Sequence, residues 1–266
     1  MPAAENHVAL RVEGVSKRFG GFYALRDVDL EVRQGDIHAI IGPNGAGKTT
    51  MFNILSGILP PDQGQITFEG HDLGKLKPYR RTELGIARTF QNIRLFEHMT
   101  VLENVMVGEH GKEFSSLWNA FHKAVLHRPF SRVAEEQRMR DRAMELLGFA
   151  ALADKHDADA DDLSYGERRL LELTRALAIE PRLLLLDEPA AGMNPQETDS
   201  LNEHIKRIRD RGVTILLVEH DMNLVMEISD RITVLNFGEK IAEGMPHEIQ
   251  ADPAVVEAYL GGEETL

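Results

Sequence analysis

A glycine-rich segment near residue 45 carries the residues that most clearly predict chemistry. It reads Gly42-x-x-x-x-Gly47-Lys48-Thr49. The glycines allow backbone N–H groups to converge on phosphate oxygens, and the N-terminus of a following helix adds partial positive charge. The lysine is placed to reach the β- and γ-phosphates, and the threonine hydroxyl is placed to ligate Mg²⁺. The segment therefore predicts a phosphate-binding loop for a nucleoside triphosphate.

Two adjacent carboxylates, Asp187 and Glu188, follow a run of leucines at 183–186. Carboxylates at the end of a buried strand are costly unless they serve a cation or a water molecule. Asp187 is the predicted partner of Mg²⁺, directly or through a water. Glu188 is placed to act as the general base that polarises the attacking water. The alternative is a solvated strand end before the turn at Pro189.

Two further polar residues stand at the ends of predicted strands. His220 follows the apolar run at 214–218, and Gln91 follows the strand predicted at 85–90. Because a parallel sheet forms its ligand crevice at the carboxyl ends of its strands, we expect His220 to face the same site and contact the γ-phosphate. Gln91 is a candidate to sense Mg²⁺ and the attacking water. Taken alone, each residue has a purely structural alternative.

The segment Leu163-Ser-Tyr-Gly-Glu167 opens a predicted helix between these motifs. The N–H groups and dipole at that helix start favour an anion, which predicts a second phosphate contact that the chain's own loop does not need. This favours a dimer in which each copy completes the other's site. The spacing of Ser164 and Glu167 equally fits a capping box, and both interpretations can hold together.

An aromatic residue near the N-terminus is a candidate for contact with the base. Phe19 lies in a glycine-rich bend and could stack on adenine, with packing in the core as the alternative.

These residues require an α/β core to position them. Continuous apolar runs are typical of strands that are buried on both faces of a parallel sheet. Such strands are predicted at 36–41, 182–187 and 214–219, alternating with helices at 48–56, 166–179 and 195–210. Residues 8–15 and 28–32 alternate apolar and polar types, which predicts half-buried antiparallel strands. Further strands are expected at 65–69 and at 232–235 paired with 240–242.

From about Asn92 the pattern changes to helical spacing without strands, at 101–109, 114–124 and 131–147. The acidic linker 153–162 that follows is expected to be exposed. We therefore predict a single domain in four parts. They are a β subdomain with the phosphate loop (1–91), a helical subdomain (92–165), the rest of the core (166–245) and a short C-terminal helical tail (246–266).

Composition excludes several classes of protein. The 266 residues carry a net charge of −13 and no cysteine. Disulfides, cysteine-ligated zinc and thiol catalysis are therefore excluded, and a broad nucleic-acid-binding face is not expected. No apolar run approaches the roughly 18–20 residues that cross a bilayer, and the N-terminus lacks the pattern of a signal peptide. We expect a cytoplasmic protein whose membrane role goes through a partner.

Taken in order, these motifs resemble those of the ATP-binding subunits of ABC transporters. The resemblance covers nearly the whole chain. It implies an α/β fold, the P-loop (RecA-like) ABC ATPase fold with an antiparallel β subdomain and an inserted helical subdomain. It also implies a head-to-tail dimer that holds two ATP molecules between phosphate loop and signature, with ATP and Mg²⁺ as the ligands.

The resemblance assigns roles to individual residues. The implied catalytic residues are Glu188, His220 and Lys48. The implied ligands of Mg²⁺ are Thr49, Gln91 and Asp187. The implied ATP contacts are Phe19, Gly42, Pro43, Asn44, Gly45, Ala46, Gly47, Lys48, Thr49, Thr50, Gln91, Asp187 and His220. The implied signature contacts in trans are Ser164, Tyr165, Gly166 and Glu167, with Asn194 in the D-loop. Tyr165, Glu167 and Asn194 depart from the general pattern of two glycines, a glutamine and an aspartate, which leaves their effect on turnover open.

Finer features look like the Liv-type importers of branched-chain amino acids. They include Arg88-Thr-Phe-Gln-Asn-Ile-Arg-Leu-Phe96 and Glu188-Pro-Ala-Ala-Gly-Met-Asn-Pro195. This resemblance implies integral membrane permease subunits, a second ATPase subunit that is identical or similar, and indirectly a periplasmic binding protein. It places the chain on the inner face of the cell membrane. The residues Ile93, Leu95, Phe96 and Met99 are candidates for contact with a permease helix, with internal packing as the alternative.

Other functions stay open at this level. The same ATPase could serve another cargo, such as urea, amides or lipopolysaccharide. An ABC ATPase that acts on DNA or ribosomes, or a nucleotide switch that does not hydrolyse, fits less well. The charge of −13 argues against an ATPase that acts on DNA or ribosomes. The intact Asp187-Glu188 pair argues against a switch that does not hydrolyse.

Overall fold

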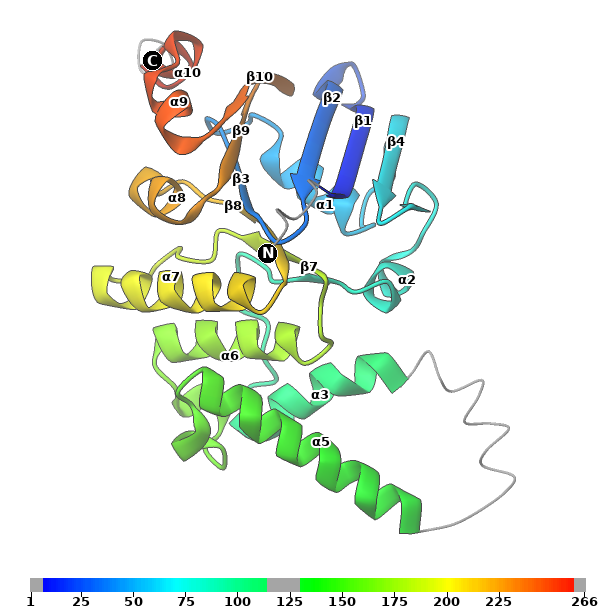
Figure 1. Cartoon of the computed structure of the whole chain (residues 1–266), viewed down its shortest axis with the longest axis vertical. Coiled ribbons are helices and arrows are strands. Elements are labelled where there is room, and N and C mark those ends of the chain that lie inside the picture. Colours follow the sequence, from blue (N-terminus) through cyan, green and yellow to red (C-terminus); the bar gives the residue numbers. More distant parts are fainter. Residues whose placement is uncertain (1–6, 114–129, 261–266) are drawn as a thin grey trace, which may run out of the picture. The chain divides into compact units, whose positions relative to one another are not determined.

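The computed structural model describes residues 7–113 and 130–260 (Figure 1). The helix predicted at 114–124 lies outside these residues. The chain divides into two compact units, which we describe separately. The first unit holds the residues up to Arg81 and from Arg182 onward, and the second unit holds Thr82–Pro181.

An antiparallel sheet forms the N-terminal part of the first unit. Its strands are β1 (Val8–Phe19), β2 (Phe22–Arg33), β4 (Gln63–Phe68) and β5 (His71–Asp72), in the order β2-β1-β4-β5. Apolar residues such as Leu10 and Val12 alternate with exposed polar ones, as in a sheet with one face on the core. The antiparallel strands expected at 8–15, 28–32 and 65–69 are confirmed, although the first two are longer than predicted.

The core of the first unit is a mostly parallel sheet. Strands β3 (Ile37–Ile41), β7 (Leu183–Asp187), β8 (Thr214–Val218) and β9 (Arg231–Asn236) run in the order β9-β3-β8-β7. Every residue of β3, β7 and β8 is buried, because the sheet is covered on both faces. Strand β10 (Glu239–Gly244) pairs antiparallel with β9 across the turn at Phe237-Gly238, as predicted.

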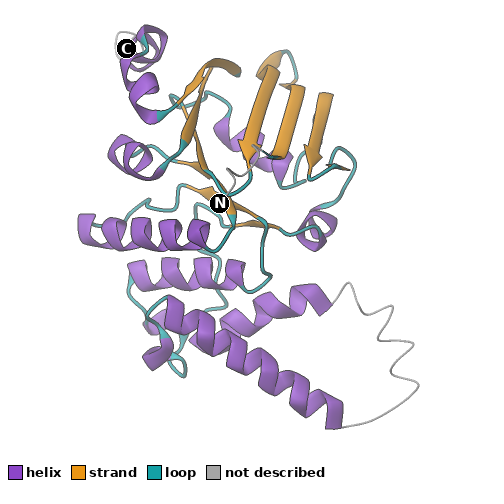
Figure 2. Ribbon diagram, in the orientation of Figure 1, coloured by secondary structure: helices purple, strands orange, loops and turns teal. Residues whose placement is uncertain are grey.

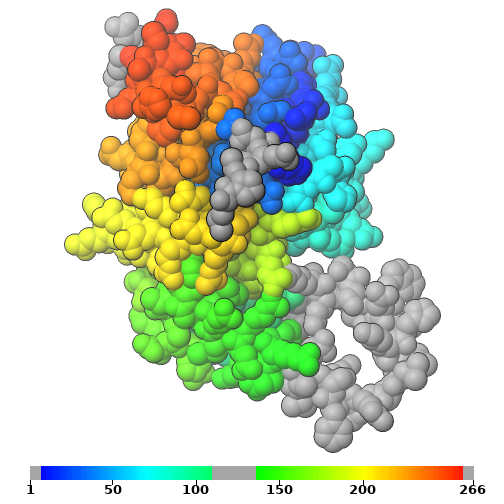
Figure 3. All heavy atoms as spheres, in the orientation of Figure 1, coloured from blue at the N-terminus to red at the C-terminus, as the bar shows by residue number. Residues whose placement is uncertain are grey.

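Helices complete the first unit (Figure 2). They are α1 (Lys48–Leu55), α7 (Pro195–Asp210), α8 (Met222–Ile228), α9 (Pro246–Ala251) and α10 (Pro253–Leu260), with α2 (Pro78–Glu83) at its boundary. Helices α9 and α10 lie within the C-terminal tail predicted at 246–266. Strand β10 contacts β2, so that the blue and orange segments meet on one surface in Figure 3.

The second unit is mostly helical and has its own core. It contains β6 (Ile86–Arg88), α3 (Val101–Glu113), α5 (Phe130–Phe149) and α6 (Tyr165–Leu177). The apolar faces of these helices meet in one cluster of buried side chains: Val101, Leu102, Val105, Ala143, Leu147, Ala150, Leu152, Ala160, Leu163, Leu171 and Ala178. Because α6 contributes to this core, the compact unit is wider than the helical subdomain proposed at 92–165.

The linker 153–162 differs from the exposed loop that we predicted. Two short 3₁₀ turns, Ala153–Lys155 and Ala160–Asp162, fold it against the start of α3. The N–H of Ala160 donates to the carbonyl of Met99 (3.0 Å), and the side chain of Ala160 is buried in the core. Its acidic residues are exposed, whereas Ala153 and Ala158 are partly buried and Ala160 is buried.

Candidate nucleotide-binding site

The predicted phosphate loop connects β3 to α1, and its glycines have backbone conformations that other residues rarely adopt. Gly45 and Gly47 have φ angles of 81° and 104°. A Cβ atom on Gly47 would lie 2.5 Å from the carbonyl oxygen of Ala24, whereas one on Gly45 would meet nothing within 4 Å. Glycine at 47 is therefore required both by its φ angle and by the close approach of β2.

We expect Gly47→Ala to destabilise the fold more than Gly45→Ala. The Gly45 variant strains only the backbone, at a cost of about 1 kcal/mol. The Gly47 variant adds a clash with backbone that cannot move freely, and we expect a cost of about 3 kcal/mol. Urea unfolding of both variants measures the difference, and equal free energies of unfolding would contradict the clash.

Lys48 is the buried cation of this loop. Its Nζ donates to the carbonyl oxygens of Gly42 (2.6 Å) and Pro43 (3.0 Å). Burial lowers the pKa of the Lys48 ammonium, and the nearby carboxylate of Glu188 partly opposes that shift. The side chain is held at the loop by backbone acceptors, and an added phosphate would offset the cost of burying its charge.

The ends of β7 and β8 bring Glu188 and His220 together. Glu188 adopts a left-handed conformation (φ 47°), and its N–H donates to the carbonyl of Val218 (2.9 Å). The Nε2 atom of His220 lies 2.6 Å from Oε1 of Glu188. Because an ionised carboxylate only accepts hydrogen bonds, the ring Nε2–H is the donor. The His220 side chain is half exposed, so this acid and histidine pair is open to a ligand.

Asp187 and Thr49 supply the oxygen atoms that suit a divalent cation. Asp187 ends β7 as a buried carboxylate, and Thr49 lies exposed at the start of α1, which contacts β7. Among the described residues no cluster of three or more acidic or histidine side chains could hold a metal by itself. That donor set fits Mg²⁺, which usually takes one or two protein oxygens together with phosphate oxygens and water.

Phe19 ends β1 with 51% of its surface exposed. Core packing, the alternative interpretation of this residue, is therefore wrong. The exposed ring keeps stacking on a base possible, and that role stays a prediction.

Asn194 caps helix α7. Its Oδ1 accepts the N–H of Glu197 (3.1 Å), and the carboxylate of Glu197 accepts the N–H of Asn194 (3.0 Å). This reciprocal cap fixes the end of the loop that begins at Glu188. The role of Asn194 in a D-loop stays a prediction.

The signature segment lies in the second unit, as does Gln91. Ser164 caps α6, and its N–H donates to Glu167 Oε2 (3.0 Å), so the predicted capping box is present. Lys155 donates a hydrogen bond to the Glu167 carboxylate (2.5 Å), and this contact is the main cause of a lowered pKa for Glu167. The negative charge that Glu167 brings to the signature is thus compensated by a lysine.

Sequence reasoning missed a buried pair that fixes Gln91. The guanidinium of Arg169 donates to the carbonyls of Phe90 and Gln91 (2.8 Å each) and to Glu172 (3.0 Å). Both charged side chains are almost wholly buried, and burial raises the pKa of Glu172. An Arg–Glu pair three residues apart within the predicted helix was the available signal, whereas the carbonyls of Phe90 and Gln91 are distant in sequence.

Glu219 was missed in the first unit. Its buried carboxylate accepts the N–H groups of Ala190 (2.8 Å) and His220 (3.0 Å). Burial raises the pKa of this carboxyl, although these backbone donors oppose the shift. The signal in the sequence was an acidic residue placed directly after the apolar strand β8.

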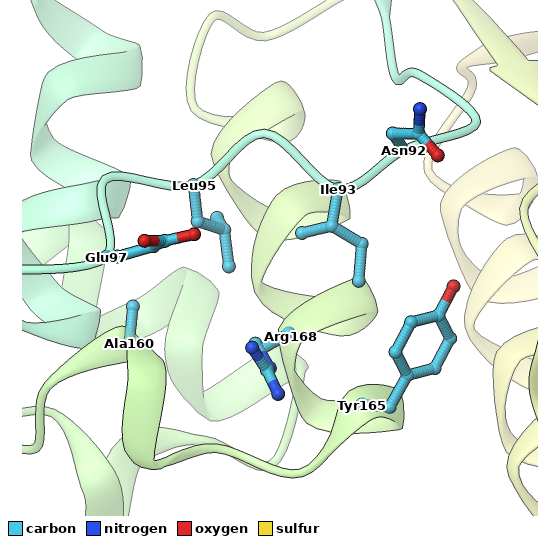
Figure 4. A pocket seen from close by; sticks show the side chains of 7 residues that line it. All are labelled: Asn92, Ile93, Leu95, Glu97, Ala160, Tyr165 and Arg168. Atoms are coloured by element: carbon cyan, nitrogen blue, oxygen red, sulfur yellow. The ribbon is translucent and has the colours of Figure 1, made fainter.

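A pocket of about 200 Å³ opens on the second unit (Figure 4). Ile93 and Leu95 reach into it from the segment before α3, and Tyr165 and Arg168 from the first turns of α6. Its walls are half apolar, with Arg168 and Glu97 as charged groups. This pocket is therefore lined by two of the predicted permease contacts, Ile93 and Leu95.

The site defines a P-loop nucleotide-binding protein, and comparison with known proteins identifies its family. A family model described as ABC transporter matches residues 25–191, and one described as branched-chain amino acid ATP-binding cassette transporter matches residues 239–265. The chain therefore belongs to the ABC transporter family, as an ATP-binding subunit. This finding confirms the predicted family, fold and ATPase class.

Similar proteins match over nearly their full length. The chain is 45% identical to the high-affinity branched-chain amino acid transport ATP-binding protein LivG of Salmonella typhimurium, over 95% of this chain and 97% of the relative. It is 43% identical to BraF of Pseudomonas aeruginosa over the same shares. A crystal structure of the ADP conformation of an ABC transporter cassette superposes with a TM-score of 0.82 at 36% identity, covering 96% of this chain and 99% of that one.

Proposed function

We propose that the protein hydrolyses ATP to power the uptake of branched-chain amino acids through separate permease subunits. The observation that carries this proposal is the similarity over 95% of the chain to LivG and BraF, whose names state branched-chain amino acid transport. Among the described residues, no helix combines the length and the apolar character that spanning a membrane requires. We propose that the chain works at the inner face of the cell membrane.

The residues of the first unit support a mechanism for hydrolysis. The phosphate loop and Lys48 bind the triphosphate of ATP. Glu188 accepts a proton from the attacking water, and His220 holds the Glu188 carboxylate in place through the 2.6 Å hydrogen bond. The oxygens of Thr49 and Asp187 would hold Mg²⁺, which would supply charge compensation when bound. Gln91, in the second unit, stays a predicted ligand of the same ion. Phe19 would stack on the adenine.

A second ATPase subunit completes each site in the proposed assembly. Ser164, Tyr165, Gly166 and Glu167 would contact the ATP held by the partner. Asn194, in the first unit, is the D-loop residue proposed to contact the partner. The capped helix start offers backbone N–H groups, and Lys155 offsets the charge of Glu167, which would otherwise repel phosphate. A dimeric structure of a cassette bound to ADP and phosphate, 26% identical with a TM-score of 0.73, supports the dimer. The partner is a second copy or a similar subunit.

The pocket of the second unit is the proposed contact for the permease. Its apolar floor of Ile93 and Leu95 would take an apolar side chain of a short cytoplasmic helix, and Arg168 and Glu97 at its rim would fix orientation. The segment that forms it begins at Gln91, which Arg169 ties to α6. Binding of the permease helix in this pocket would therefore act on the position of Gln91. A periplasmic binding protein would act from the other side, through the permease.

Reconstitution of the complete transporter tests this function. The chain is co-expressed with candidate permeases and a second ATPase, placed in lipid vesicles and supplied with the binding protein. We expect leucine, isoleucine or valine to stimulate ATP hydrolysis several-fold, because closure of the dimer is coupled to the loaded permease. Stimulation by urea or amides instead would contradict the cargo, and no stimulation by any permease pair would contradict transport.

A variant of the pocket serves as the matched test of docking. Ile93→Asp places a charge on the pocket floor and should remove the stimulation by permease and cargo. Glu203→Gln, at an exposed position on α7, should keep it. Full stimulation of the Ile93 variant would contradict the proposed contact.

A further inference from the structure

The loops that carry Glu188 and His220 are joined by one buried carboxylate. Glu219 is the first residue after β8 and is 4% exposed. Its Oε1 accepts the N–H of Ala190 at 2.8 Å, two residues after Glu188, and its Oε2 accepts the N–H of His220 at 3.0 Å. The backbone N–H of Asp221 also donates to this carboxylate. One side chain thus holds two loops from different strands.

We propose that Glu219 is a positioning residue for ATP hydrolysis, which fixes the Glu188 loop against the His220 loop. This inference rests on the roles proposed above for Glu188 and His220. Its test therefore distinguishes a failure of the role of Glu219 from a failure of those proposed roles. The Glu188 loop is otherwise bonded to the end of β8 through its own N–H and the carbonyl of Val218. Glu219 adds the second connection, beyond Glu188, so that the acid is held on both sides.

The chemistry of the contact favours positioning over simple packing. A buried carboxylate is costly, and a neutral side chain of similar volume would fill the space without that cost. Bonds from backbone N–H groups to an ionised carboxylate are short and strong, and they set the distance between the two loops within narrow limits. The 2.6 Å contact of His220 with Glu188 depends on that distance. A general base must be aligned closely, since a displacement of about 1 Å can cost about a hundredfold in rate.

The contact of Glu219 with Ala190 also fixes the loop that leads to α7. From Ala190 the chain runs through Met193, whose N–H donates to the carbonyl of Ala190 (3.1 Å), to the cap at Asn194. The position of Asn194 is therefore linked to Glu219 through a short bonded segment. In the proposed dimer this segment would lie near the second subunit. Glu219 would therefore fix both the alignment of Glu188 and the loop that contacts the partner.

Two substitutions of Glu219 test the inference in the complete transporter. Glu219→Gln keeps volume and one acceptor oxygen but turns an NH₂ group toward a backbone donor. Glu219→Ala removes both acceptors. We expect kcat to fall about tenfold in the first variant and about a hundredfold in the second. The Kd for ATP should change less than twofold in both, because the phosphate loop is untouched.

A double-mutant cycle with His220→Ala distinguishes positioning from a merely structural role. If Glu219 acts by aligning His220 with Glu188, removing His220 should cost much less in the Glu219→Gln background than in the wild type. Glu243→Gln is the matched control, since it neutralises another carboxylate of the first unit that is bonded to Arg231 and Lys240, and it should keep wild-type kcat. Thermal unfolding is measured for every variant.

The possible results distinguish the proposal for Glu219 from the function proposed for the protein. Wild-type kcat in both Glu219 variants would overturn the inference alone, as would penalties for Glu219→Gln and His220→Ala that simply multiply. A large rise in the Kd for ATP together with early unfolding of Glu219→Gln would also overturn it, in favour of a structural role. Wild-type kcat in His220→Ala would overturn the role proposed for His220, and no hydrolysis by the wild type would overturn the proposed function itself.

Discussion

Replacing Glu188 by glutamine should block steady-state ATP hydrolysis while ATP binding is retained. The amide keeps the shape of the side chain and an oxygen that can accept from His220 Nε2, so the 2.6 Å contact can persist. What the amide lacks is the basicity to accept a proton from water. Loss of general base catalysis costs about 10²- to 10⁴-fold in rate. Phosphate release under saturating ATP measures the loss, and nucleotide titration measures the retained affinity.

The Glu188→Gln variant also tests the dimer. If ATP is bound but not hydrolysed, the closed assembly should accumulate, and its mass in solution should double when ATP is added. Glu239→Gln is a suitable control, because that carboxylate is exposed and paired with Arg26 at 3.0 Å in the same unit. Hydrolysis by Glu188→Gln at the wild-type rate would overturn the assignment of the base.

The sequence was informative where chemistry is local in the chain. The phosphate loop needs glycines, a lysine and a threonine at fixed spacing, and the structure places them between β3 and α1 as expected. The strand ends at Asp187 and His220 followed from runs of apolar residues, because only strands buried on both faces are continuously apolar. Knowing that the strands are parallel was enough to expect that Glu188 and His220 share an edge of the sheet.

The sequence was silent where a residue acts through distant partners. The contacts of Arg169 with the carbonyls of Phe90 and Gln91, and of Glu219 with the N–H of Ala190, run to other segments, and no spacing along the chain records them. Charged residues such as these are usually solvated, so their types alone predict exposure. The linker 153–162 illustrates the same limit, because its acidic residues concealed the buried Ala160.

The compact helical unit, Thr82–Pro181, extends beyond the predicted helical subdomain of 92–165. The prediction assigned helix α6 to the rest of the core at 166–245. Its buried face includes Leu171, which packs with Val101 and Leu147 of α3 and α5. Packing of the apolar face, rather than the role of the helix start, decides to which compact unit a helix belongs.

Lys48→Met should weaken ATP binding strongly. The ammonium is buried and held at the loop by the carbonyls of Gly42 and Pro43. Methionine preserves the length and packing of the side chain but removes the charge and all donors. Because hydrogen bonds between charged groups are about twice as strong as neutral ones, we expect ATP affinity to fall about 10- to 100-fold.

The direction of the pKa shift at Lys48 sharpens this prediction. Burial alone lowers the pKa, so the charged form is disfavoured by its surroundings, with only the Glu188 carboxylate opposing. A bound polyphosphate would reverse that balance, and part of the binding energy should therefore come from satisfying this cation. Lys240→Met, which removes an exposed lysine paired with Glu243 at 2.9 Å, should leave the Kd for ATP unchanged. If Lys48→Met bound ATP as tightly as the wild type, the loop's backbone N–H groups alone would hold the phosphates, and the role of Lys48 would be confined to the transition state.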